Sequence, residues 1–561
     1  MKIAFLTSYN TDLFKKELEK YISNYIKNCS FFFNAYGTQE KIVYDKSSSL
    51  YSFNPNIIII HFEIEWLLGD FAYDILSLAE NERYNKLKEY ESKISLLIQN
   101  ITDKLPNTKI IIENFIPRDK PILSILDSNI NYGLEEITLQ LNNFLFSQKK
   151  IYSDRIIIHD YATFISNFGR INCFDYRLYR LAKNPFAKSF YNELFNHYTN
   201  IIDALVNPRK KCIVVDLDNT LWGGIVGQDG VENIILGGTG IGEAYVQFQK
   251  VLLNFYRKGI FLGICSKNNY EDAMEVIEKH PDMILRKENF ASIKINWLDK
   301  VTNIINIAND LNISTDSIVF LDDNPVECEL VRQKLPEVEV VNLSGDPDNY
   351  IKQLLSIRSL NTTFLTDEDL VRNKMFLANE KRKELEQNSF SLDDYYKSLE
   401  MKAHIYVNDI SHISRISQLT QKTNQFNLTT RRYTVEEVKN FIQNGEYRIY
   451  TLRLLDKFGD NGIVLVAIIK MENEMWVIDT FLMSCRVIGR QAETALLEAI
   501  IDDAQRVGVK SIIGEFIKTP KNAPAENFFS NHRFTLLSNN KWKLDLPAKK
   551  FSHYIKIIRG N

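Results

Sequence analysis

A short apolar run that ends in two aspartates constrains the fold of this chain more than any other feature. Cys212–Val215 has the composition of a buried β-strand and leads directly into Asp216-Leu217-Asp218-Asn219-Thr220. Side chains alternate along a strand, so Asp216 and Asp218 share a face, and the turn that follows lets both reach one Mg²⁺. The pattern Asp-x-Asp-x-Thr uses common residues and also occurs by chance, so its meaning depends on the surrounding sequence.

Two further strands with polar ends supply that context. Ile260–Cys265 is an apolar run that ends in Ser266-Lys267-Asn268, and Ser317–Leu321 ends in Asp322-Asp323-Asn324. Ligands bind at the carboxyl ends of strands in doubly wound parallel sheets, and these polar residues all fall there. Amphipathic helical segments alternate with the strands, as such a sheet requires, at Gly242–Lys258 and Tyr270–Lys279.

Each of these polar residues taken alone fits a strand-end turn or a helix cap, where Asp, Ser and Asn are favoured. Their occurrence as an ordered set on three strand ends favours a catalytic site instead. A carboxylate attacks a phosphate dianion only where a cation and hydrogen-bond donors offset the repulsion. The set therefore predicts phosphoryl chemistry.

The order of these motifs resembles the haloacid dehalogenase (HAD) superfamily of phosphatases and phosphotransferases. The resemblance implies that Asp216 is the nucleophile that forms an aspartyl-phosphate, and that Asp218 is the general acid and base. It also implies that Ser266 binds the phosphoryl oxygens and that Lys300 neutralises charge. The Mg²⁺ ligands that it implies are Asp216, Asp218, Asp322 and Asp323. Lys294 is an alternative to Lys300, which is favoured because the helix after it leads into the third strand.

A narrower resemblance is to the FkbH-like branch of the superfamily, within subfamily IIIC. It spans roughly residues 204–534. The motifs that carry it in the phosphatase region are Asp216–Gly230, Cys265–Asn268 and Leu321–Pro325. The motifs that carry it further along the chain are Thr423–Asn427, Lys457–Gly462 and Ser484–Arg490.

The FkbH-like resemblance implies a reaction on 1,3-bisphosphoglycerate, as part of polyketide biosynthesis. The glyceryl group would pass to the phosphopantetheine thiol of an acyl carrier protein, with release of phosphate. Two alternatives stay open. The chain could be a phosphatase of a small phosphorylated metabolite, or a coenzyme A or pantetheine-binding scaffold whose phosphatase site is idle.

Cysteine is the natural relay for such an acyl transfer, because an acyl phosphate is already activated toward a thiol. Cys265 adjoins Ser266 in the phosphatase motif and is preferred on that ground. Regular alternation would nevertheless point its side chain away from that of Ser266, as expected of a buried core cysteine. Cys485 is the alternative, because Arg486 and a helix end could lower the pKa of its thiol.

The first 207 residues have their own alternation of strands and helices, which predicts an α/β domain with a parallel sheet. In FkbH-like proteins this region is similar to SGNH-type or flavodoxin-like domains. Ser8 and Asn114 match two SGNH positions, whereas Asp175 has no histidine at the expected offset. A serine without a base is barely nucleophilic, so a binding or docking module is expected. A triad of Ser8 with His159-Asp160 is disfavoured, because adjacent residues point apart. The strands expected in this domain are Ile3–Leu6, Ile57–Ile60, Ile110–Ile112 and Ile156–Ile158.

The remaining boundaries predict a HAD domain at 208–358, a helical linker at 359–402 and a GNAT-like α+β domain at 403–561. The charged run Glu380–Glu386 predicts a solvated helix within the linker. In the last domain, Arg486–Ala492 resembles the GNAT loop that holds the coenzyme A pyrophosphate, and the helix amino terminus supplies the donors. Phe529 and Arg533 replace the usual Tyr and Gly, which makes amine acetylation doubtful and leaves pantetheine binding. The cofactor-binding residues implied are Arg486, Gly489, Arg490, Ala492 and Asn522.

Composition excludes several other classes of function. The chain has 561 residues, and its net charge of −3 is well mixed, which argues against nucleic acid as the main partner. Its 6 cysteines are scattered without metal-site or disulfide spacing, as expected of reduced thiols in a cytoplasmic protein. The apolar runs are far shorter than the roughly 20 residues that a bilayer requires, and no signal peptide is apparent.

Overall fold

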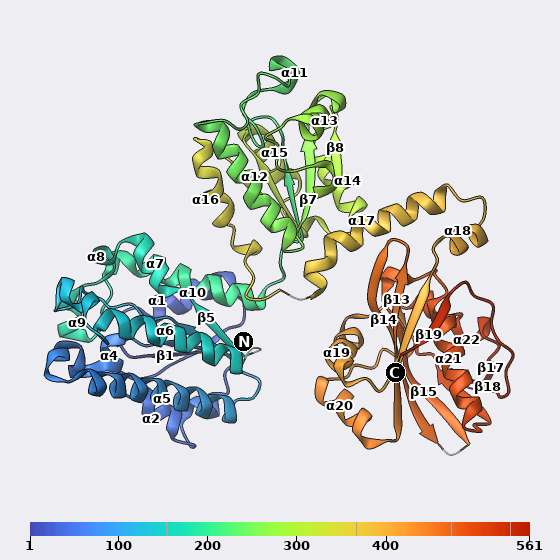
Figure 1. The fold of residues 1–561 in the computed structure, drawn as a ribbon, viewed down its shortest axis with the longest axis horizontal. Helices are drawn as coiled ribbons and strands as arrows, with labels where there is room; N and C mark the ends of the chain where they lie inside the picture. Colours follow the sequence, from blue (N-terminus) through green and yellow to red (C-terminus); the bar gives the residue numbers. More distant parts are fainter. Residues whose placement is uncertain (153–154, 366, 473, 539, 561) are drawn as a thin grey trace. The chain divides into compact units, whose positions relative to one another are not determined.

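The computed structural model describes residues 1–152, 155–365, 367–472, 474–538 and 540–560 (Figure 1). The chain forms two compact units, Met1–Thr366 and Asp367–Asn561. Within these described ranges, the first unit contains two five-stranded sheets, and the second contains one mixed sheet of nine strands. The expected multi-domain α/β architecture is confirmed.

The first sheet is parallel throughout, with the strand order β2-β1-β3-β4-β5. Its strands are β1 (Lys2–Thr7), β2 (Ser30–Phe33), β3 (Ile57–His61), β4 (Lys109–Glu113) and β5 (Ile156–His159). The apolar runs predict four of these strands and miss β2. This edge strand pairs on one side only, and its run of three phenylalanines is short and only half-buried.

Isoleucines on alternate positions build a core on each face of this sheet. Ile58, Ile60 and Ile110 belong to one apolar cluster, and Ile57 and Ile59 belong to the other. The side-chain period of 2 in a strand explains this division.

The first face is covered by α2 (Gln39–Tyr44), α3 (Ser49–Phe53), α4 (Ile64–Leu68), α5 (Glu80–Lys104) and α6 (Leu134–Ile151). The second face is covered by α1 (Lys15–Tyr25), α7 (Tyr161–Phe168), α8 (Arg170–Cys173) and α10 (Tyr191–Val206). Helix α9 (Tyr176–Ala182) precedes α10 along the chain.

The second sheet is also parallel, with the order β10-β9-β6-β7-β8 (green to yellow in Figure 1). Its strands are β6 (Cys212–Val215), β7 (Phe261–Ser266), β8 (Phe290–Ile295), β9 (Ile318–Asp322) and β10 (Glu339–Asn342). Its helices are α11 (Val226–Asp229), α12 (Ile241–Arg257), α13 (Tyr270–Lys279), α14 (Lys300–Asp310), α15 (Pro325–Lys334) and α16 (Tyr350–Leu355). The three strands that were predicted are the central ones, which are buried on both faces. The missed strands, β8 and β10, form the two edges of the sheet and include polar residues, Ser292 and Lys294 in β8 and Glu339 and Asn342 in β10.

The carboxyl-terminal unit has a mostly antiparallel sheet in the order β17-β18-β16-β15-β14-β13-β11-β19, with β12 beside β15. Two pairs, β15 with β16 and β11 with β19, are parallel, which fits the expected α+β class. The strands are β11 (Lys402–Val407), β12 (Phe426–Asn427), β13 (Tyr447–Asp456), β14 (Gly459–Glu472), β15 (Met475–Met483), β16 (Ser511–Glu515), β17 (Thr535–Ser538), β18 (Lys541–Asp545) and β19 (Lys556–Arg559). The helices are α17 (Asp367–Gln387), α18 (Leu392–Ser398), α19 (Ile413–Lys422), α20 (Val435–Asn444), α21 (Ala492–Arg506) and α22 (Phe528–Asn531).

Helix α17 is anchored to this second unit by a buried ion pair. Both nitrogens at one edge of the Arg382 guanidinium donate to Asp456, at 2.8 and 2.7 Å. Both side chains are almost fully buried. The prediction of a solvated helix at 380–386 is therefore wrong for Arg382. The balanced charges in that run do not reveal that one arginine has a buried partner 74 residues further along the chain.

The buried His61 makes the first sheet sensitive to acid. Its Nδ1 lies 3.1 Å from the Tyr9 hydroxyl and 2.5 Å from the Tyr198 hydroxyl. Burial lowers the pKa of His61 from 6.5 to about 4, although the charge of Glu113 opposes the shift. The unfolded chain therefore binds a proton between these two values that the folded chain does not bind.

We expect His61 to remove roughly 3 kcal/mol of folding free energy as the pH falls from 7 to 4. In His61→Gln, an amide keeps a hydrogen bond to a tyrosine but does not titrate, so stability should fall less over this range. Urea unfolding of both proteins at a series of pH values measures the difference. Parallel pH profiles would contradict the expectation.

Candidate functional site

Three neighbouring strands of the second sheet end in the predicted site residues. Asp216 follows β6, Ser266 ends β7 and Asp322 ends β9. Strand β6 lies between β7 and β9, so the three polar ends are adjacent. The sequence order of the motifs differs from their order across the sheet, and the parallel pairing brings them together.

Lys300 reaches this edge from the first turn of α14. Asp299 caps the helix by accepting a hydrogen bond from the Thr302 amide, 2.9 Å away. Gly263 of β7 allows α14 to pack closely, since an added Cβ would lie 3.2 Å from the Ile307 side chain. These local features place Lys300 at the carboxyl end of the sheet.

The Lys300 ammonium bridges two of the predicted carboxylates. Its Nζ lies 2.7 Å from Asp216 Oδ1 and 3.1 Å from Asp322 Oδ2, and it donates to the Cys265 carbonyl at 2.8 Å. Burial alone would lower the pKa of Lys300, but the adjacent carboxylates raise it above its ordinary value. The lysine is therefore charged and offsets the repulsion between the two aspartates. Lys294, the alternative lysine, pairs instead with Asp310 at 2.8 Å.

Asp216, Asp322 and Asp323 can offer oxygens that lie within 4.8 Å of one another. Burial, followed by the charge of Asp216, raises the pKa of Asp322 to about 7 and that of Asp323 to about 6. Three carboxylates this close hold more negative charge than Lys300 alone can neutralise. An all-oxygen set of this kind suits Mg²⁺, so these residues fit the expected ion.

Asp218 lies apart from this group of carboxylates. Its Oδ1 accepts hydrogen bonds from Trp222 Nε1 at 2.9 Å and from the Val226 amide at 3.2 Å. Its Oδ2 accepts one from Asn268 Nδ2 at 2.9 Å. Burial raises the pKa of Asp218, while these donors oppose the shift. Both of its oxygens thus have protein donors, which fits proton transfer better than a side-chain metal ligand.

Three contacts in this region were not predicted as functional. Asn268 and Trp222 hold the Asp218 carboxylate, although both lie inside motifs quoted for the resemblance. Thr220 donates a long hydrogen bond of 3.4 Å to Asp323. Their positions within the motifs are the sequence signal that could have suggested these roles.

The two candidate cysteines lie in different surroundings. Cys265 is fully buried, and its Sγ lies 3.7 Å from the Lys300 carbonyl oxygen. Burial raises the pKa of Cys265 to about 12, which opposes a role as a thiolate relay. Ser266 is also buried, on the next position of the strand. Cys485 is exposed.

Cys485 lines a cavity of about 780 Å³ in the carboxyl-terminal unit. Two of the sequence motifs meet there, because β12 pairs with β15 and brings 423–425 next to 484–486. The cationic residues that line the cavity are Arg415, Lys422, Arg486 and Lys521.

The other predicted cofactor-binding residues have structural partners. Arg490 is buried and donates to Asn379 and to the Arg486 carbonyl, at 3.1 and 3.0 Å. Asn522 is buried and donates to the Asn427 and Ile517 carbonyls, at 3.0 and 2.9 Å.

The last two predicted residues, Gly489 and Ala492, have structural roles. The Gly489 carbonyl accepts from Tyr396 at 2.8 Å, and Ala492 is the buried first residue of α21. Of the five predicted residues, Arg486 lines the cavity.

The SGNH-type positions of the first sheet do not form a triad among the described residues. Ser8 Oγ accepts from the Glu63 amide at 2.8 Å, and Asn114 donates to Asp160 at 2.9 Å. Asp175 caps α9 by accepting from the Leu178 amide. His159 lies beside Glu113, three strands away from Ser8 in the sheet order.

Among the described residues, none of the helices combines the length and apolar character needed to cross a bilayer.

Comparisons with known proteins found similarity to an FkbH domain and to a protein that contains a phosphatase domain. Residues 2–203 match the family model of the FkbH amino-terminal domain. A solved structure of the amino-terminal part of a Bacteroides fragilis protein contains a phosphatase domain and is complexed with Mg. It is 29% identical, covers 65% of this chain and 95% of that chain, and has a TM-score of 0.59. A search of the curated proteins found no match. Residues 2–203 are thus similar to the FkbH amino-terminal domain, and the chain is similar to a protein that contains a phosphatase domain.

Two further solved structures overlap with shorter parts of this chain. A Mycobacterium tuberculosis protein in complex with CoA is 15% identical, covers 23% of this chain and 70% of that chain, and has a TM-score of 0.19. A GNAT-family acetyltransferase from Staphylococcus aureus is 14% identical, covers 26% of this chain and 99% of that chain, and has a TM-score of 0.21. Both TM-scores are below 0.5, so neither overlap indicates a function for this chain.

The difference in burial between the two cysteines predicts their reactivity. We expect iodoacetamide to modify Cys485 in the folded protein while Cys265 stays protected, because reaction requires an accessible thiolate. Peptide mass spectrometry after short labelling times measures both sites, and labelling in urea provides the control. Equal labelling rates in the folded protein would contradict this assignment.

Proposed function

We propose that the chain is a Mg²⁺-dependent HAD-type phosphatase that also acts in glyceryl transfer. In this proposal, the glyceryl group of 1,3-bisphosphoglycerate passes to the phosphopantetheine thiol of an acyl carrier protein, and phosphate is released. The contact of Lys300 with both Asp216 and Asp322 carries the phosphatase part of the proposal. The resemblance of the sequence motifs supports the transfer part.

The residues at the strand ends fit attack on a phosphate ester. Asp216 would attack phosphorus, forming an oxygen–phosphorus bond to its carboxylate while the bond to the leaving oxygen breaks. Asp218, held by Trp222 and Asn268, would donate a proton to the leaving oxygen. It would then take a proton from a water molecule that attacks phosphorus, while the bond from phosphorus to the Asp216 oxygen breaks and phosphate is released. Lys300 would offset the negative charge during both steps. Asp216, Asp322 and Asp323 would hold Mg²⁺, which supplies further positive charge at the phosphoryl oxygens.

The two phosphates of 1,3-bisphosphoglycerate require different chemistry. The acyl phosphate leaves as phosphate when a thiol attacks its carbonyl carbon. The phosphate ester on the terminal oxygen must be hydrolysed separately before the carrier holds a plain glyceryl thioester. Hydrolysis of that ester is the step that the Asp216 site fits.

The cavity beside Cys485 is the proposed dock for the carrier's phosphopantetheine arm. That arm carries a phosphate, and Lys422, Arg486 and Lys521 supply positive charge in the cavity lining. A volume of about 780 Å³ is within the range of small-molecule and cofactor sites. Coenzyme A contains the same pantetheine and is the alternative occupant.

One observation favours a second candidate function, a phosphatase of a small phosphorylated metabolite. Cys265 is buried and its thiol pKa is raised to about 12, so the phosphatase site lacks a reactive thiol at that position. This candidate requires phosphate release that does not depend on a carrier protein.

We expect Asp216→Asn to abolish formation of the glyceryl thioester, with a loss of at least about a thousandfold in rate. The assay contains 1,3-bisphosphoglycerate, Mg²⁺ and phosphopantetheinylated carrier, whose intact mass is then measured. Asp310→Asn, which removes the partner of Lys294, is the matched control and should retain activity. In the variant, the carrier should remain unmodified or keep the heavier phosphoglyceryl group. A glyceryl adduct that persists in Asp216→Asn contradicts the proposal, and phosphate release with unmodified wild-type carrier supports the second candidate.

The proposed dock makes a separate prediction for the carrier. Replacing both Lys422 and Lys521 with alanine should raise the KM for the carrier by about tenfold, because two charges near the phosphate are lost. Hydrolysis of small phosphate esters should be unchanged. Steady-state kinetics at several carrier concentrations measure the effect. An unaltered KM would place the carrier elsewhere.

A further inference from the structure

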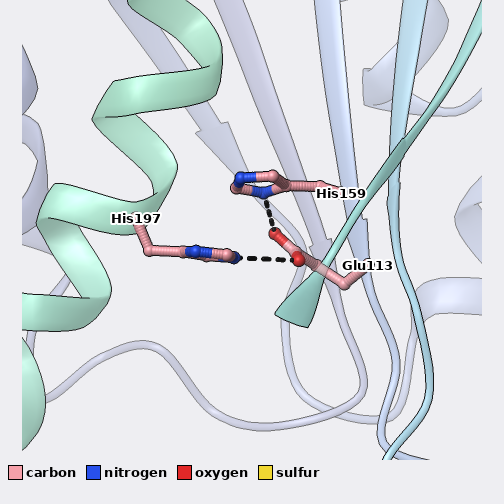
Figure 2. A group of neighbouring side chains, drawn as sticks. All are labelled: Glu113, His159 and His197. Atoms are coloured by element: carbon pink, nitrogen blue, oxygen red, sulfur yellow. Dashed lines mark hydrogen bonds and ion pairs between the residues drawn. The ribbon is translucent and has the colours of Figure 1, made fainter. Parts of the chain in front are cut away.

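Two histidines and a glutamate meet at the carboxyl end of the first sheet, outside the phosphatase site (Figure 2). Glu113 is the last residue of β4, His159 is the last residue of β5, and His197 lies within α10. Figure 2 shows both rings directed at the carboxylate, one from the neighbouring strand and one from the helix. We name these residues the Glu113–His159–His197 cluster.

Each oxygen of the Glu113 carboxylate faces one imidazole nitrogen. Nδ1 of His159 lies 2.9 Å from Oε1, and Nε2 of His197 lies 3.0 Å from Oε2. One ligand atom of each residue lies within 4.8 Å of the other two. Zinc bonds of about 2.0–2.1 Å in a tetrahedral site place the ligand atoms about 3.3 Å apart. Side-chain movements of roughly an ångström would therefore bring all three to one ion.

The side chains of the cluster are largely buried and packed against neighbouring rings. The Glu113 side chain is fully buried, and its recorded partners among the described residues are the two imidazoles. A buried carboxylate needs a positive charge or strong donors to offset its desolvation. The His197 ring stacks between His159, at 3.8 Å, and Phe164, at 4.2 Å. The His159 and His197 rings are only 17° from parallel, so one of them must rotate for both nitrogens to reach one ion.

The ligand chemistry selects a different ion from that of the phosphatase site. Imidazole nitrogen suits zinc and other first-row transition metals, whereas Mg²⁺ prefers oxygen alone. Two histidines and one glutamate leave the fourth position of a tetrahedral site open. His159 is 16% exposed, so the cluster reaches the protein surface at this residue. Ligands also bind at this edge of parallel sheets.

We propose that the Glu113–His159–His197 cluster binds a zinc-type divalent transition metal with one open coordination position. The site lies in a different sheet from the phosphatase residues, so it stands independently of the proposed enzyme activity. The alternative is a triad of hydrogen bonds that only stabilises the fold, and the experiment distinguishes the two.

The full-length protein is freed of metal with a chelator, the chelator is removed, and Zn²⁺ is titrated in by calorimetry with excess Mg²⁺ present. We expect one tight site per chain, and an affinity at least about 100-fold weaker in His159→Gln. Cobalt substitution provides a second readout, since a tetrahedral nitrogen and oxygen site gives strong visible absorption. The matched control is His280→Gln, a histidine outside the cluster, which should bind as the wild type does.

Partly exposed His159 is the residue to change, because replacing buried His197 or Glu113 could prevent folding. Thermal unfolding supplies a further test, since Zn²⁺ should raise the Tm of the wild type and leave that of His159→Gln unchanged. Equal zinc affinity in His159→Gln and wild type would overturn the proposal. So would a wild-type chain without a tight site, which would leave the hydrogen-bonded triad as the explanation.

Discussion

The Lys300 ammonium, held between the Asp216 and Asp322 carboxylates, is the interaction on which the phosphatase-type site depends. Half-buried Asp216 and buried Asp322, at the ends of adjacent strands, repel each other, and removing this cation would leave both charges uncompensated. The lysine reaches them because α14 begins at the strand edge and packs closely over Gly263. The site is therefore organised by one charge that the helix brings to the sheet.

The same architectural rule organises the amino-terminal half of the chain twice. In both parallel sheets, polar side chains follow apolar strands and gather at the carboxyl edge. One edge gathers aspartates around a lysine, and the other gathers histidines around Glu113. The two sets differ in ligand atoms, oxygen in one and mostly nitrogen in the other, and so favour different ions. Similar strands thus position two chemically distinct groups.

Strands could be predicted most reliably from the sequence where both faces of the strand are buried. The apolar runs of β6, β7 and β9 are evident in the sequence, whereas the edge strands β8 and β10 carry polar residues and were missed. Among site residues, the strand-end aspartates could be identified from their motifs. The donors that hold the Asp218 carboxylate, Trp222 and Asn268, could not be identified, because they depend on how the loops fold. The solvated helix expected around Arg382 failed because its buried partner, Asp456, is distant in sequence.

The sequence by itself determined the apolar strands, their alternation with helices and the acidic motifs at their ends, since these depend on residues near one another in the chain. Tertiary structure alone decided which of two lysines meets the aspartates, which cysteine is exposed and which motifs share a cavity. It alone also joined Glu113 to His159 and His197, because each strand and helix contributes a single member. Contacts of this kind depend on packing between segments that are distant in sequence, so a local sequence pattern does not predict them.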